Sequence, residues 1–154
     1  MNYKRILIAI DDRDNSTNVA KTGFELAEQL KAEVAIVYAV DLSKVIRNYD
    51  MVNPELGLFI KDSIVESKES ANKAIDSLVH KFNRDKEITR FTPEGSPREV
   101  IIEVSEDWKA DLIVIGLHGK SGIGIFFMGS ISQYISLHSK VPVLIVPQIE
   151  ETKK

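Results

Sequence analysis

Four short, continuously apolar runs constrain the fold of this chain more than any other feature of its sequence. They are rich in β-branched residues and do not alternate with polar positions: Ile6–Ile10, Val34–Val40, Leu112–Ile115 and Val143–Val146. Runs of this kind are typical of strands that are covered on both faces, as in a parallel sheet. The more polar run Glu87–Thr92 is predicted to be an edge strand.

Segments with helical character separate these runs. A helix is predicted over residues 16–31, with Ser16 as its cap. Residues 54–82 carry one apolar stripe at helical spacing, and 130–138 form a short helix. The segment Ser96–Glu99 matches a capping box with proline at the first helical position, and it predicts the start of another helix.

Strands and helices therefore alternate in the order β-α-β-α-β-α-β-α-β. Because right-handed crossovers then place helices on both faces, we predict an α/β fold with an open, doubly wound parallel sheet of five strands. Such sheets bind ligands beyond the carboxyl ends of the strands, where the strand order reverses. The segments that follow Ile10, Val40 and Ile115 are the places to search for function.

Five of the eight glycines lie in one stretch, Gly116–Gly129, directly after a predicted strand. Glycine tolerates positive φ and has no Cβ, so backbone amides can approach an anion closely. The helix that follows offers free amides at its positive end, and Ser130 and Ser132 add hydroxyl groups. We interpret the stretch as a phosphate-binding loop; the alternative is a loop whose glycines serve tight turns alone.

Composition excludes several classes of protein. A length of 154 residues corresponds to one domain, and 20 Lys and Arg against 23 Asp and Glu give a formal net charge of −3. This charge argues against nucleic acid or an anionic membrane as a partner. With no cysteine, disulfides, thiolate nucleophiles and Cys-ligated zinc are excluded. No stretch approaches the ~20 apolar residues of a membrane helix, and we predict a soluble, cytoplasmic protein.

The glycine spacing resembles a known signature. Gly116, two residues, Gly119, nine residues and then Gly129-Ser130 are similar to the nucleotide-binding motif of the universal stress protein family, in its ATP-binding branch. Nearly the whole chain shares the resemblance, because Ile6–Asp11 resembles the family's first strand with its terminal aspartate, and Val141–Pro147 resembles its last strand.

The resemblance implies a fold and an assembly. It implies one family domain over residues 1–149 with a charged tail at 150–154. The implied fold is adenine-nucleotide alpha-hydrolase-like, that is Rossmann-like, with strand order 3-2-1-4-5. It also implies a homodimer formed through the last strand, Val141–Pro147.

The resemblance further implies an adenine nucleotide, ATP or AMP, bound as a regulatory ligand. Asp11 matches the family aspartate beside the adenosine, and the backbone of Ala39 matches the residue that meets the adenine. The remaining candidates for ribose and phosphate contact are Gly116, His118, Gly119, Lys120, Gly129, Ser130, Ile131 and Ser132. For His118, a solvent-facing loop histidine is an equal alternative.

Charge compensation sets this chain apart from many relatives. Where they carry basic residues, residues 123–128 read Ile, Gly, Ile, Phe, Phe and Met. ATP has about four negative charges, whereas the loop offers Lys120 and a helix end worth roughly half a charge. We therefore expect Mg²⁺ to accompany the triphosphate, with Arg47 as a further candidate for positive charge.

Two other functions stay open. One is a slow ATP hydrolase or phosphotransfer enzyme, although the loop has no carboxylate or glutamine in an obvious position to orient a nucleophile, so we expect weak hydrolysis at most. The other is an assembly module that uses no nucleotide. Histidines at helical metal-binding spacing are absent from the sequence, and no metal site is predicted.

Overall fold

The computed structural model describes residues 2–12, 15–43, 56–82, 84, 88–117 and 129–148. Within these ranges strands and helices alternate along the chain as predicted. The elements are β1 Arg5–Ile10, α1 Ser16–Leu30, β2 Glu33–Tyr38, α3 Leu56–Lys81, β3 Ile88–Phe91, α4 Pro97–Asp107, β4 Leu112–Gly116, α5 Ser130–His138 and β5 Val143–Val146.

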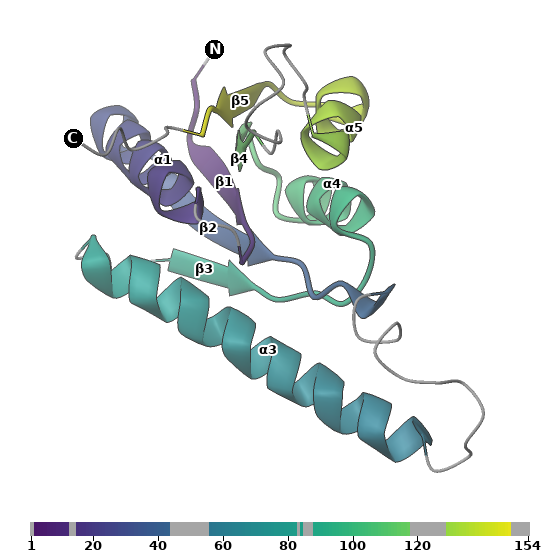
Figure 1. Ribbon diagram of the computed structural model, residues 1–154. Helices are drawn as coiled ribbons and strands as arrows, with labels where there is room; N and C mark the ends of the chain where they lie inside the picture. The colour runs from purple at the N-terminus through teal and green to yellow at the C-terminus, as the bar shows by residue number, and fades with distance from the viewer. Residues whose placement is uncertain are drawn as a thin grey trace, which may run out of the picture.

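The five strands form one parallel sheet in the order β3-β2-β1-β4-β5 (Figure 1). The doubly wound sheet and its strand order are thereby confirmed. Strand β1 is central, and its Ile8 lies opposite Ile36 of β2 and Val114 of β4. Residues 6–10 of β1 are all buried, as their continuous apolar character predicts.

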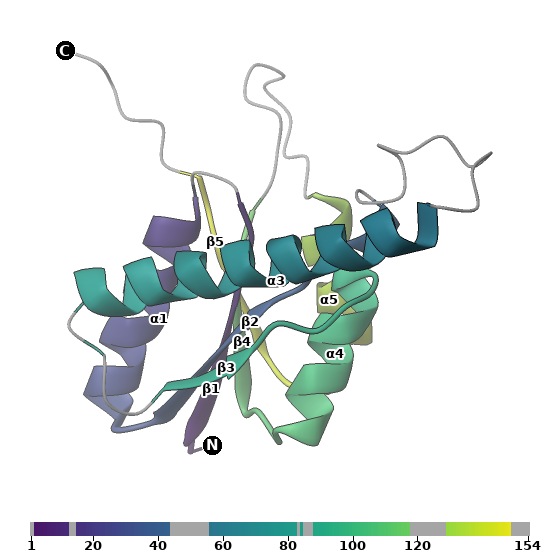
Figure 2. The same ribbon diagram turned by 90° about the horizontal axis from the view of Figure 1, so that it is seen from below.

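Helices cover both faces of the sheet and produce two apolar cores. On one face α1 and α3 pack against alternate strand residues, with Phe24 and Ile75 among the buried side chains. On the other face α4 and α5 bury Ile101 and Ile135. Helix α3 runs along β3 and β2, and its amino-terminal part reaches past the strands (Figure 2). None of the helices in the described ranges combines the length and apolarity needed to cross a membrane.

Two predicted strands differ from expectation. Strand β2 ends at Tyr38, two residues earlier than predicted, and Val40 instead forms an isolated parallel bridge with Glu94. Strand β5 is not covered on both faces, since its Leu144 is 37% exposed. The reason is position, because β5 is the last strand in the sheet order and pairs with β4 along one side.

The predicted helix caps need correction. Asn15, not Ser16, is the N-cap of α1. The Ser16 hydroxyl donates to the carbonyl of Asp11 at 2.7 Å and accepts from the Asp11 N–H at 3.2 Å. Ser96 does precede α4, with Pro97 first in the helix, but its side chain makes no capping bond. Neither α1 nor α4 is therefore capped by a side-chain hydrogen bond from its N-cap residue.

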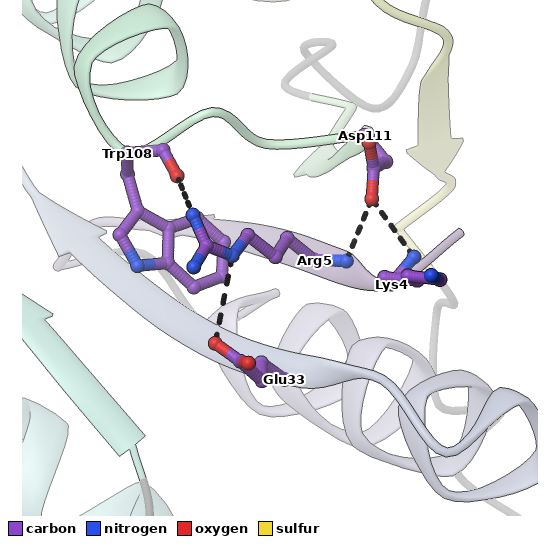
Figure 3. A network of polar contacts seen from close by, with 5 residues as sticks. All are labelled: Lys4, Arg5, Glu33, Trp108 and Asp111. Carbon is purple, nitrogen blue, oxygen red and sulfur yellow. Dashed lines mark hydrogen bonds and ion pairs between the residues drawn. The ribbon is translucent and has the colours of Figure 1, made fainter. Parts of the chain in front are cut away.

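A polar network fastens the amino ends of three strands (Figure 3). The Asp111 carboxylate accepts backbone N–H groups of Lys4 at 2.8 Å and Arg5 at 2.9 Å. The Arg5 guanidinium donates to the Trp108 carbonyl at 3.0 Å, lies 5.6 Å from that indole ring and pairs with Glu33 at 3.5 Å. The start of β1 is therefore tied both to β2 and to the turn before β4.

We predict that Asp111→Ala lowers the free energy of unfolding by about 2 kcal/mol, because two backbone donors lose a charged acceptor. The variant should remain folded, since each buried aliphatic side chain of β1 contributes about 1.5–3 kcal/mol. Urea unfolding followed by circular dichroism measures the change. Asp107→Ala is the matched control, because the exposed Asp107 side chain makes no hydrogen bond or ion pair with the described residues; equal stability of both variants would contradict the prediction.

Candidate functional site at the carboxyl edge of the sheet

The strand order reverses between β1 and β4. The chain leaves β1 toward α1 on one face of the sheet, whereas the helix that follows β4, α5, covers the opposite face (Figure 1). Connections that diverge in this way define the topological switch point, where doubly wound sheets bind ligands. The residues just beyond these strand ends are therefore the candidate site.

The described candidate residues gather at this edge. Asp11 follows β1, Ala39 follows β2, and Gly116 ends β4. The others open α5: the N-cap is Gly129, and Ser130, Ile131 and Ser132 form the first turn. The candidates His118, Gly119 and Lys120 lie outside the described residues, as does Arg47.

The ends of β1 and β2 bring carboxylates close to a phenol. Tyr38 pairs in register with Ile10, directly before Asp11 and Asp12. Burial raises the pKa of the Tyr38 hydroxyl above its usual 10.0, and the negative charges of Asp12 and Asp11 raise it further. The phenol is therefore kept protonated as a hydrogen-bond donor. Within the described ranges no group of three or more His, Asp and Glu side chains is placed to hold a metal ion.

A buried amide joins the ends of β4 and β5. Asn15, 2% exposed, donates from Nδ2 to the carbonyl of Val146 at 3.2 Å, and that carbonyl also accepts the Leu117 N–H at 2.8 Å. A Cβ on Gly116 would lie 2.9 Å from both Asn15 Nδ2 and Val19 Cγ2. Packing alone therefore favours glycine at this position, whether or not Gly116 also contacts a ligand. Asn15 Oδ1 is buried with no hydrogen-bond partner among the described residues.

The first turn of α5 has backbone donors that find no partner among the described residues. The first backbone bond of the helix runs from the Gln133 N–H to the Gly129 carbonyl at 2.9 Å, so the amides of residues 130–132 precede the helical ladder. Ser130 is exposed. Ser132 is 1% exposed, and its hydroxyl donates to the Gly129 carbonyl at 3.0 Å. An anion at this end would meet amides and the Ser130 hydroxyl first.

The segment around Ala39 is held by the connection between β3 and α4. Val40 donates to the Pro93 carbonyl at 2.8 Å, and Gly95 donates to the Val40 carbonyl at 3.0 Å. Gly95 has a φ of +141°, and a Cβ there would lie 2.8 Å from Val100 Cγ1. The start of α4 is consequently fixed beside the end of β2.

Sequence reasoning did not identify three polar residues at this edge. Asn15 was not identified because the sequence does not distinguish a buried amide before a helix from an ordinary N-cap. Tyr38 was not identified because it lies inside an apolar run. Arg98 lies in the first turn of α4, exposed, where the sequence suggested only a cap. A useful signal was available: each residue stands within a few positions of a predicted carboxyl end of a strand or the helix start that follows it.

The strand order and the two helical layers define a Rossmann-like α/β protein of the adenine-nucleotide alpha-hydrolase-like type. The model of the universal stress protein family matches residues 2–147, and the chain belongs to that family.

Individual relatives span nearly the whole chain. Universal stress protein MJ0531 of Methanocaldococcus jannaschii is 32% identical over 144 residues, which cover 94% of this chain and 82% of the relative. The solved structure of MJ0577 has a TM-score of 0.80 at 22% identity, covering 98% of this chain and 100% of that one. The Archaeoglobus fulgidus universal stress protein solved in complex with dAMP has a TM-score of 0.60 at 22% identity, covering 94% and 98%.

We predict that Tyr38 makes the protein less stable at alkaline pH. Below pH 10 the phenol is protonated in both the folded and unfolded states. Above it, the unfolded chain releases the proton first because the folded pKa is raised, so the free energy of unfolding falls until the folded pKa is passed. Tyr38→Phe should lose less stability than wild type between about pH 9 and 11. Urea unfolding across this pH range tests the prediction, and Tyr134→Phe is the control for removing a phenol. If the free energy of unfolding of Tyr38→Phe falls with pH as steeply as that of wild type, the prediction is refuted.

Proposed function

We propose that this protein binds an adenine nucleotide, ATP or AMP, as a regulatory ligand at the carboxyl edge of its sheet. The observation that carries the proposal is the convergence of Asp11, Ala39, Gly116 and the start of α5 at the point where the strand order reverses. Two solved relatives support it: a universal stress protein in complex with cAMP, with a TM-score of 0.65 at 23% identity, and the Archaeoglobus fulgidus protein in complex with dAMP.

The residues at this edge have the chemistry that a nucleotide needs. The Asp11 carboxylate would accept hydrogen bonds from the ribose hydroxyls or the adenine amino group. The backbone at Ala39 would contact the adenine base. Open amides at the start of α5 would take phosphate oxygens. Asn15 Oδ1 is a buried acceptor with no partner among the described residues, so a donor supplied by a ligand would remove a desolvation cost of about 1–3 kcal/mol.

The carboxylates at this edge favour a cation as a partner for the phosphates of a bound nucleotide. Asp11, Asp12 and Asp41 all follow β1 or β2, so the edge has an acidic side. A triphosphate would be repelled there unless a cation lies between, and Mg²⁺ bridging phosphate oxygens would supply that charge. We therefore expect ATP to bind more tightly with Mg²⁺ than with a chelator present.

The decisive test is calorimetric titration of ATP and AMP into wild type and Gly119→Val. A side chain at Gly119 should obstruct the ligand, so we expect at least a tenfold loss of affinity, about 1.4 kcal/mol, in a folded variant. Gly57→Val is the matched control, because a Cβ on Gly57 in α3 meets nothing within 4 Å. Equal affinity of wild type and folded Gly119→Val would exclude this loop as the site.

Assays of phosphate release and of nucleotide retained after purification separate the alternative functions. Sustained release of phosphate from ATP with Mg²⁺ would favour a slow hydrolase over a regulatory binder. A wild-type protein that binds no nucleotide, and carries none after purification, would favour an assembly module.

We also propose a homodimer formed through Val141–Pro147. Strand β5 ends the described sheet, with Leu144 exposed and Val143 and Ile145 half-buried. The free side of such a strand offers backbone groups for pairing with a second copy, and the prolines at 142 and 147 limit how far pairing extends.

Leu144→Lys should convert this dimer into a monomer, because a charge would be buried where the two strands meet. Sedimentation velocity at micromolar concentration measures the change. Leu30→Lys is the matched control, since Leu30 is similarly exposed at 41% but ends α1. Wild type that sediments as a monomer would end the proposal.

A further inference from the structure

The exposed Arg98 differs from the other arginines of the described chain. Arg5, Arg84 and Arg90 each pair with a carboxylate. No carboxylate of the described residues pairs with Arg98. Its guanidinium instead lies 5.2 Å from the centre of the Tyr134 ring, which bridges from α4 to α5.

The tyrosine fixes where this cation lies. Helices α4 and α5 pack side by side on the same face of the sheet, and both begin at its carboxyl edge. Tyr134 stands one turn after Ser130, and helical side chains lean toward the amino end of their helix. The ring also stacks on His138 at 3.9 Å, which holds its orientation. The contact with Tyr134 therefore holds the guanidinium against α5, near the edge of the sheet where both helices begin.

Two sets of donors then lie near the carboxyl edge, on the face of the sheet that α4 and α5 cover. The amides of residues 130–132 precede the helical ladder of α5, and the guanidinium of Arg98 approaches from α4. A planar guanidinium matches phosphate oxygens in a bidentate manner. Stacking on Tyr134 has already restricted the side chain, so less conformational freedom is lost when an anion binds.

We propose that Arg98 is a phosphate-binding residue of this site, and that it makes the protein discriminate phosphorylated adenosine from adenosine itself. The inference rests on the proposed function and deepens it. Arg98 adds positive charge to the edge that also carries the carboxylates of Asp11 and Asp12. Its role is to bind phosphate, whereas Tyr134 positions the guanidinium.

The test compares ATP with adenosine, both titrated by calorimetry into wild type and Arg98→Gln. We expect ATP to bind about tenfold more weakly to the variant, while adenosine binds equally to both. Lys140→Gln is the matched control: it removes one positive charge near the opposite end of the same helix pair, where Lys140 meets Glu106 at 3.1 Å. Arg98→Lys should recover part of the ATP affinity, because it restores charge without the planar fork.

The outcomes distinguish the two proposals. Wild type that binds neither ligand overturns the proposed function, and this inference with it. Unchanged ATP affinity in Arg98→Gln overturns the role of Arg98 alone. Equal losses for ATP and adenosine in a variant that melts like wild type would also overturn it, since the residue would then act on the nucleoside part.

Discussion

The pairing of β1 with β4 is the constraint on which the rest of this structure depends. Residues 6–10 and 112–115 are at most 6% exposed, and they lie against helices on both faces. Burial of this kind contributes about 1.5–3 kcal/mol for each large side chain, well above the ~1 kcal/mol of a single hydrogen bond. The two strands therefore fix the positions of the remaining elements, and polar contacts adjust the ends.

The same pairing creates the candidate site. Because β1 and β4 are neighbours whose following helices cover opposite faces, their chain segments must separate as they leave the sheet. Backbone and side-chain groups at the separation cannot all find partners within the sheet. Asn15 illustrates this, since its Nδ2 reaches the Val146 carbonyl but its Oδ1 has no partner among the described residues. Gly116 permits the close approach that brings Asn15 there.

The sequence predicts the parts of this fold that depend on local pattern and burial. Continuous apolar runs located four of the strands, and the glycine stretch pointed to the edge where the site was sought. Local pattern does not predict contacts between distant parts of the chain. The Ser16 hydroxyl bonds to Asp11 instead of capping α1, and β5 is half-exposed because the strand order makes it an edge strand. Arg98 and Tyr134 lie 36 residues apart, and their contact arises only when α4 packs on α5.

The amino and carboxyl ends of the strands, at opposite edges of the sheet, differ in how completely their polar groups are paired. At the amino edge, Asp111, Arg5, Glu33 and Trp108 satisfy one another in a continuous network. At the carboxyl edge, an amide oxygen, an arginine and a helix start remain open among the described residues. Closing the second edge in the same way would add stability but leave no group for a ligand. The fold thus secures its strands at the amino edge, and this allows donors and acceptors without partners in the described part of the chain to persist at the carboxyl edge.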